Sequence, residues 1–186
     1  MIIASQKRKE NIAEYLLYMW QVEDLIRANG LDIDRIEKNV IDKFDLAPEV
    51  RREMRDWYEG LIDMMRREDL QKSGHLQINK NVLIRLADLH QELLRDTRFP
   101  DYTAEFYKTL PYIVELRSKG GDNPAGELET CFNALYGALM LRLQGKEISS
   151  GTAQALAQIT RFLALLAKDY HLDQAGKLFP AEEEDK

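Results

Sequence analysis

The chain has 186 residues, of which 45% are hydrophobic and 31% are charged, a composition typical of one globular domain and not of a disordered protein. Its formal net charge of −6 argues against broad binding to nucleic acids or anionic membranes, because both need clustered positive charge. The single cysteine, Cys131, cannot form an internal disulfide, and neither a signal-peptide pattern nor an apolar run of about 18 residues is present. We therefore expect a cytoplasmic protein that does not enter a membrane.

Apolar residues recur with a helical period along nearly the whole chain, and the alternation typical of strands is essentially absent. Several boundaries have physical signals. Gly30 and Gly145 can take the left-handed conformation that ends a helix, Pro48 suits a first helical position, and Ser149 or Ser150 can cap the helix that follows. The expected helices cover about 6–28, 33–44, 48–71, 78–95, 102–118, 124–144 and 150–170.

These helices predict an all-α fold, in the form of a single-domain antiparallel helical bundle of about six to seven helices over residues 1–175. After Ala175 the apolar period stops, and we expect residues 176–186 to form an acidic, flexible C-terminal tail. The helix at 124–144 is apolar on almost all sides, which predicts a central position in the bundle.

Three of the expected helices carry an ionisable residue near the middle of an apolar face: Glu23, His90 and Arg142. A lone buried charge is costly, so each of these side chains is paired, neutral or at the edge of its face. Glu23 and Arg142 have opposite charges, and we expect them to form a buried ion pair. The alternative is a pair between Glu23 and Arg27 on the same helix. His90 is more typical of a satisfied core histidine than of a catalyst.

The sequence offers no catalytic motif and no cofactor or metal site. None of the three histidines follows a glutamate by three residues, as a di-iron carboxylate bundle requires, and one cysteine with dispersed histidines does not make a zinc site. Glycine-rich phosphate loops and nucleophile elbows are missing. Cys131 lies within an apolar face, which predicts an inert, packed thiol. The basic residues around Arg51 and Arg66 share a helix with more acidic residues than basic ones, so we expect surface ion pairs and no nucleic-acid site.

Two functions remain open, and the sequence leaves undecided whether the protein is an enzyme. The first is a non-enzymatic helical protein that acts by self-association, as a homodimer for example, or by binding a protein partner. It rests on the missing catalytic motifs and on the broad apolar surfaces of the helices at 6–28 and 124–144. The second is a small-molecule-binding or enzymatic bundle with a pocket between helices. That pocket would be formed by Glu23, His90 and Arg142, with hydrogen-bonding walls from Tyr15, Tyr107 or Tyr136.

Four blocks of the sequence carry a resemblance: Lys7–Arg27, Trp57–Arg67, Gly74–Asn81 and Glu127–Gly137. Together they resemble an uncharacterised family of bacterial helical proteins, a domain of unknown function known mainly from gut anaerobes. The similarity covers about residues 1–178. It implies an all-helical fold, and it implies no activity.

Overall fold

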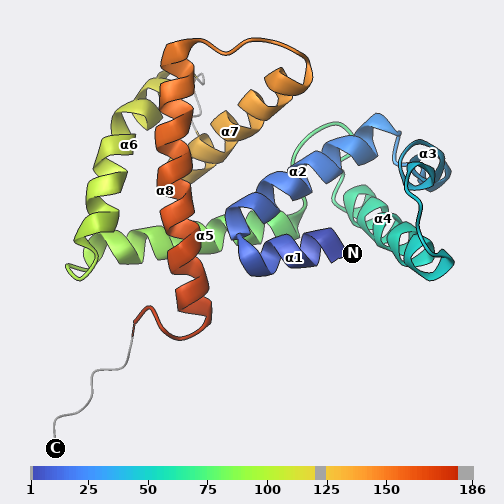
Figure 1. Cartoon of the computed structure of the whole chain (residues 1–186), viewed down its shortest axis with the longest axis horizontal. Helices are drawn as coiled ribbons and strands as arrows, with labels where there is room; N and C mark the ends of the chain where they lie inside the picture. Colours follow the sequence, from blue (N-terminus) through green and yellow to red (C-terminus); the bar gives the residue numbers. More distant parts are fainter. Residues whose placement is uncertain (1, 120–124, 180–186) are drawn as a thin grey trace, which may run out of the picture. The chain divides into compact units, whose positions relative to one another are not determined.

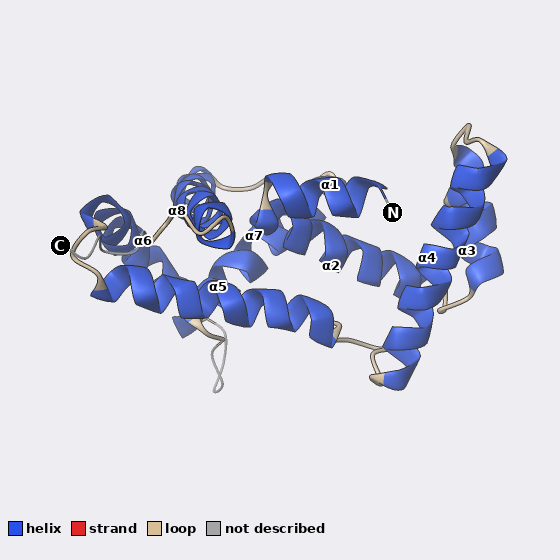
Figure 2. Ribbon diagram, turned by 90° about the horizontal axis from the view of Figure 1, so that it is seen from below, coloured by secondary structure: helices blue, strands red, loops and turns tan. Residues whose placement is uncertain are grey.

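The computed structural model describes residues 2–119 and 125–179, and this part of the chain contains eight α-helices, one short 3-10 helix and no strand (Figure 1). The expected all-α class is therefore confirmed, and in Figure 2 the described residues form helices joined by loops. The antiparallel bundle arrangement stays a prediction. The helices are α1 (Ile2–Glu10), α2 (Ile12–Ala28), α3 (Ile33–Asn39), η1 (Ile41–Lys43), α4 (Pro48–Arg67), α5 (Gln77–Arg95), α6 (Pro100–Ser118), α7 (Glu127–Leu143) and α8 (Ser150–Gln174).

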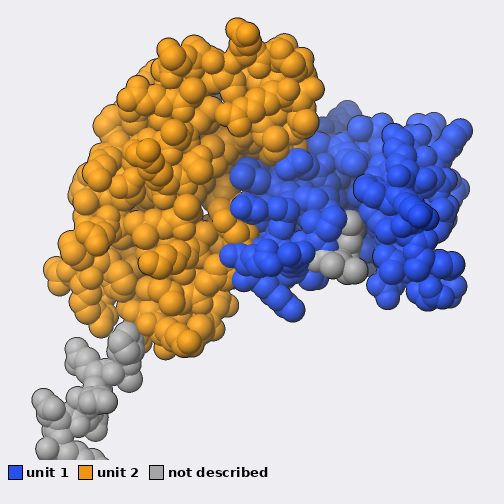
Figure 3. All heavy atoms as spheres, viewed as in Figure 1, with its two compact units in different colours: residues 1–10, 14–82 blue, residues 11–13, 83–186 orange. Residues whose placement is uncertain are grey.

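Contacts along the backbone divide the chain into two compact units, which Figure 3 colours separately. Unit 1 comprises Met1–Glu10 and Glu14–Val82, and unit 2 comprises Asn11–Ala13 and Leu83–Lys186. The expected division into a helical domain at 1–175 and a tail at 176–186 stays a prediction. Within the described residues, Leu178 is buried and the ring of Phe179 lies 5.5 Å from that of Phe99, while residues 180–186 fall outside them.

Unit 1 begins with two helices where the sequence predicted a single long one. The break at Asn11 has a local cause, because the Asn11 side chain accepts a hydrogen bond from the Ala13 N–H at 3.0 Å and so caps the first turn of α2. After the break α1 lies beside α2 (Figures 1 and 2), and Lys7 Nζ approaches Glu14 Oε2 to 2.9 Å. The apolar period continues through residue 11, which is why the pattern alone did not indicate the break.

Ion pairs join α3 to α4 at the surface of unit 1. Glu37 places Oε1 3.1 Å from Arg51 and Oε2 3.0 Å from Arg55, and Arg55 also lies 2.9 Å from Asp34. Hydrogen bonds from Arg55 and Arg51 hold the pKa of the Glu37 carboxyl below its ordinary value. The predicted surface of ion pairs on this helix is confirmed, whereas the expectation that the protein has no nucleic-acid partner stays a prediction.

The predicted helix boundaries hold at several positions. Gly30 and Gly145 both have a φ of 69°, the left-handed conformation expected at the ends of α2 and α7. Pro48 occupies the first position of α4, and the Ser149 hydroxyl accepts the Thr152 N–H at 3.2 Å at the start of α8. These ends follow from local chemistry, so the sequence was sufficient to predict them.

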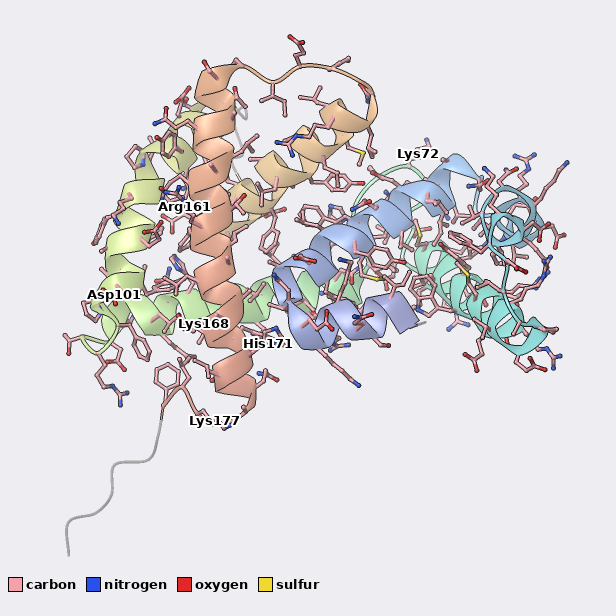
Figure 4. All side chains as sticks on the ribbon, viewed as in Figure 1. Lys72, Asp101, Arg161, Lys168, His171 and Lys177 are labelled. Carbon is pink, nitrogen blue, oxygen red and sulfur yellow. The ribbon has the colours of Figure 1, made fainter. Side chains whose placement is uncertain are left out.

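In unit 2, a polar contact holds α6 against α8. The Gln158 side chain of α8 donates hydrogen bonds to Glu105 Oε1 at 2.7 Å and to Thr109 Oγ1 at 3.2 Å, both on α6. Figure 4 places Arg161 on the side of α8 that faces α6. The hydrogen bond from Gln158, then Lys108 and Arg161, hold the pKa of Glu105 below its ordinary value. An ionised carboxylate therefore sits where the two helices meet.

The second half of α7 is not central, contrary to the expectation from its all-round apolar character. Leu128, Cys131 and Phe132 in the first half are buried, but Leu141 and Leu143 are exposed. Figure 1 shows α7 running away from α8 toward its C-terminal end, which explains the difference in burial. The apolar pattern predicted which residues share a face, but it could not show that the last turn of α7, with Leu141 and Leu143, is exposed.

Candidate functional site

Glu23 is fully buried in unit 1, with a relative exposure of 0%, and its carboxylate meets the start of α5. Oε1 accepts hydrogen bonds from the Leu76 backbone N–H at 3.0 Å and from the Asn79 side-chain amide at 2.6 Å. Leu76 immediately precedes α5, whose first N–H groups have no partner within the helix. Nearby, Glu68 accepts the Gln77 N–H at 2.7 Å. Two carboxylates therefore cap α5, where the helix dipole favours negative charge.

The second oxygen of Glu23 faces a histidine. His75 Nδ1 lies 2.6 Å from Glu23 Oε2, and the imidazole stacks on the indole of Trp20 with ring centroids 4.2 Å apart and planes 14° from parallel. The His75 side chain is 30% exposed. Because Nδ1 is directed at the buried carboxylate, Nε2 is the ring nitrogen that remains for an external group. A carboxylate that orients a half-exposed histidine is an arrangement used in acid–base chemistry, although here it also fixes the loop before α5.

Arg27 completes the surroundings of Glu23. Its guanidinium lies 4.0 Å from Glu23 Oε2, its Nε donates to the Leu70 carbonyl at 3.1 Å, and its Nη2 donates to the Gly74 carbonyl. Arg27 thus offsets the buried negative charge of Glu23, and its hydrogen bonds to Leu70 and Gly74 hold the loop between α4 and α5 in place.

The expected buried pair between Glu23 and Arg142 is wrong, and the alternative contact with Arg27 is present. Both carboxylate oxygens of Glu23 are taken by groups of unit 1, and Arg142 is an exposed residue near the end of α7. Opposite charge on two apolar faces suggested the pair. The actual partners of Glu23 include the Leu76 backbone N–H and the Asn79 side-chain amide. Both groups are uncharged, so a search for opposite charges cannot find them.

His90 of α5 lies in the core of unit 2 among aromatic rings. Its Nδ1 is 2.7 Å from the Tyr102 hydroxyl, its Nε2 is 3.5 Å from Glu127 Oε2, and its ring centroid is 4.7 Å from that of Phe106. Burial lowers the pKa of His90, and Glu127 opposes that shift. Burial also raises the pKa of Tyr102, so its hydroxyl keeps its proton. The tautomer of His90 decides whether the hydroxyl or Nδ1 donates in the hydrogen bond between them. When the hydroxyl donates, the proton of the neutral imidazole is on Nε2, which faces Glu127 without forming a hydrogen bond.

We expect the stability of the protein to fall as the pH is lowered from about 8 to about 5, with His90 contributing to the loss. The pKa of His90 is lower in the folded state than in the unfolded state, so the unfolded chain binds more protons as the pH drops through the unfolded value. The measurement is the free energy of unfolding in urea at both ends of this range. His90→Gln retains a hydrogen-bonding side chain that does not titrate, and it should lose less stability across the range than the parent. Equal losses in the two proteins would contradict this role.

Arg142 lines a small cleft of about 190 Å³ between α7 and α8, together with Leu139 and Leu156. It belongs to unit 2 with His90, whereas Glu23 belongs to unit 1. A pocket shared by Glu23, His90 and Arg142 stays a prediction. Tyr107 is exposed on α6, and Tyr15 is buried on α2, where it lines a pocket of unit 1.

An apolar groove on unit 1 lies between α1, α2, α4 and the residues that flank η1. It has a volume of about 430 Å³, and we call it the unit 1 groove. Phe44 and Tyr58 both line it. Phe44 is 53% exposed, and burial raises the pKa of Tyr58 to about 12. Glu53 is its charged lining residue. The main apolar lining consists of Ile3, Leu25, Val40, Phe44, Val50 and Met54.

The apolar and charge patterns of the sequence did not indicate His75 and Asn79, which meet Glu23 in place of Arg142. A signal was available, because both belong to the block Gly74–Asn81, and Glu23 belongs to the block Lys7–Arg27. The groove was missed for another reason. Its lining comes from four separate elements, and only their packing brings these side chains together.

Residues 2–119 and 125–179 contain neither a metal-binding cluster nor a membrane-spanning helix. No group of three or more His, Cys, Asp or Glu side chains is placed there to hold a metal ion. No helix in the same ranges is long and apolar enough to cross a bilayer.

Burial raises the pKa of the Cys131 thiol to about 12, so this thiol stays protonated, as expected of a packed cysteine.

These features define an all-helical protein with buried polar centres and an apolar surface groove. The chain belongs to the family described as a domain of unknown function, DUF4924, which matches residues 1–177. The resemblance to an uncharacterised family over nearly the whole chain is thereby confirmed, while the bacterial origin stays a prediction. No curated protein and no solved structure matches the chain. The function is unknown, and the enzymatic alternative gains no support from the comparisons.

Proposed function

We propose that this protein acts by self-association, with the unit 1 groove of one copy receiving the exposed end of α7 from a second copy. The groove itself is the observation that carries the proposal. Its apolar lining and its open, 53% exposed Phe44 are typical of a surface that binds another chain. A cytoplasmic location remains part of the proposal.

The occupant is suggested by an apolar stripe on α7 whose C-terminal end is exposed. Leu135, Leu139 and Leu143 recur at intervals of four residues on α7. Leu143 is 70% exposed, whereas Leu135 and Leu139 are half-buried and line the cleft beside α8. Leucines at this spacing are the anchors that an amphipathic helix inserts into a groove. We call these three residues the α7 stripe.

Charge complementarity favours a second copy as the source of the bound helix. Arg142 lies beside Leu143 on the α7 stripe, and Lys146 follows in the exposed turn. Glu53 is the charged residue that lines the groove, whereas residues 43–53 as a whole carry acidic and basic side chains in equal number, so the complementarity with Arg142 rests on Glu53. Opposite charges at the rim assist encounter and orientation. In a closed dimer each copy would give one such contact and receive another, so that both surfaces are used.

The test uses two substitutions at exposed positions, which should leave the fold intact. We expect the parent protein to associate with increasing concentration in sedimentation velocity experiments. Phe44→Glu places a charge in the groove, Leu143→Glu places one on the α7 stripe, and each should weaken association at least about tenfold. Val114→Glu, at an exposed position of α6 outside both surfaces, is the matched control and should associate like the parent.

Mixing the two variants provides the sharper result. The Phe44→Glu protein keeps an intact stripe and the Leu143→Glu protein keeps an intact groove, so one native contact can form between them. We expect the mixture to associate more tightly than either variant alone. A monomeric parent at every concentration would overturn the proposal, and so would a Leu143→Glu protein that associates like the parent. The second result would mean that the groove receives something other than α7.

A further inference from the structure

A second cavity in unit 1 differs from the groove because it combines polar donors with an apolar floor. It has a volume of about 330 Å³ and lies between α1, α2, α4 and the first turn of α5. We call it the α1 pocket. The space is at the lower end of the range that small-molecule sites occupy, so it suits a small ligand.

The polar side of the α1 pocket comes mainly from α1. Ser5 and Arg8 are three residues apart, so they share a face of this helix, and both line the cavity. The Arg8 guanidinium lies over the ring of Tyr15, 5.6 Å from its centroid. This cation–π contact leaves the guanidinium N–H donors available. Within the described ranges, no ion pair involves Arg8.

Tyr15 adds a second donor to this side. Burial raises the pKa of Tyr15 above its ordinary value. The positive charge of Arg8 opposes this shift and the negative charge of Glu23 adds to it, but the pKa remains raised. The hydroxyl therefore stays protonated and can donate a hydrogen bond to an anion. A guanidinium together with hydroxyl donors is the chemistry that recognises a carboxylate.

The opposite side of the pocket is apolar and aromatic. Met19 of α2 and Trp57, Leu61 and Met64 of α4 line it. Methionine and tryptophan side chains pack readily against hydrocarbon or aromatic surfaces of varied shape. Asp56 also lines the cavity, and its negative charge disfavours a ligand with a second carboxylate.

We propose that the α1 pocket binds a small apolar monocarboxylate, with the carboxylate on Arg8 and the hydrocarbon portion against Trp57 and Met64. This site is independent of the self-association proposed above, because Arg8, Tyr15 and Trp57 do not line the unit 1 groove.

The test is an isothermal titration calorimetry experiment, in which octanoate is added to the full-length protein below the concentration at which it forms micelles. Octanol and octylamine serve as ligands of similar length without the carboxylate. We expect saturable binding of one octanoate per chain and at least about tenfold weaker binding of the other two compounds. Arg8→Gln should weaken octanoate binding by a similar factor while leaving octanol binding unchanged. Lys9→Gln, at a neighbouring exposed position outside the pocket, is the matched control and should bind like the parent.

The two tryptophans provide an independent readout of position. Trp57 lines the pocket and Trp20 does not, so octanoate should shift the indole N–H resonance of Trp57 in NMR spectra and leave that of Trp20 nearly in place. Assignment comes from Trp57→Phe. No saturable binding, equal affinity for octanol, an Arg8→Gln protein that binds normally, or a shift confined to Trp20 would each overturn the proposal.

Discussion

Glu23→Ala is expected to destabilise unit 1 by about 3–5 kcal/mol, the range found when one member of a buried charged pair is removed. The substitution removes the acceptor of the Leu76 N–H and of the Asn79 amide, and it leaves Arg27 without its buried counter-charge. Glu23→Gln keeps a side chain of similar shape and one acceptor oxygen, so we expect a smaller loss of about 1–3 kcal/mol.

Urea unfolding followed by tryptophan fluorescence measures this effect directly, because Trp20 and Trp57 both belong to unit 1. Glu14→Ala is the matched control. Glu14 lies on the same helix, but its side chain is largely exposed and contacts Lys7 at the surface, so its removal should cost less than about 1 kcal/mol. A Glu23→Ala protein that unfolds at the same urea concentration as the control would contradict the structural role of the buried carboxylate.

Phe162→Ala is expected to destabilise unit 2 by about 3–5 kcal/mol, as is usual when a large aromatic side chain is removed from a core. Phe162 is fully buried, and its ring centroid lies 5.6 Å from that of Phe106 and 5.7 Å from those of Tyr102 and His90. Removing the ring leaves a cavity on one side of His90, so the hydrogen bond to Tyr102 also loses its packing support.

Hydrogen exchange of peptides from α6 and α8 gives a measurement specific to unit 2. We expect much faster exchange in Phe162→Ala than in the parent, in proportion to the lost free energy. Tyr107→Ala removes an aromatic ring of similar size from an exposed position of α6 and should change exchange little. Similar exchange in the two variants would show that Phe162 does not support the core.

The fold was predictable from the sequence wherever local chemistry decides. The helical period gave the class, and Gly30, Pro48 and Ser149 marked ends that the structure confirms. The break at Asn11 was not predicted, because the apolar period continues across this residue. The helix nevertheless ends there, and the Asn11 side chain caps the start of the next one. Periodicity identifies a face, but it is insensitive to a single capping residue within that face.

The candidate site was predictable only in part. Glu23 was recognised as an acid on an apolar face, and it is buried. Its partners lie in a loop and an N-terminal helical turn distant in the chain, where His75 and Asn79 fit no charge pattern. The prediction that Arg142 is buried was wrong, because this residue lies near the end of α7, where the helix is exposed. A sequence pattern shows which residues are suited to burial, whereas only packing decides what covers them.

The separation of Glu23 from its partners also affects how unit 1 can form during synthesis. His75 follows Glu23 by 52 residues, and Asn79 follows it by 56. At about 5–20 residues per second, a ribosome takes on the order of several seconds to add that stretch. Until then Arg27, on the same helix, is the partner within reach of Glu23, and the groups that bond both of its carboxylate oxygens are still missing. The native environment of Glu23 is therefore complete only once the start of α5 has been made, so burial of this acid comes late in the formation of unit 1.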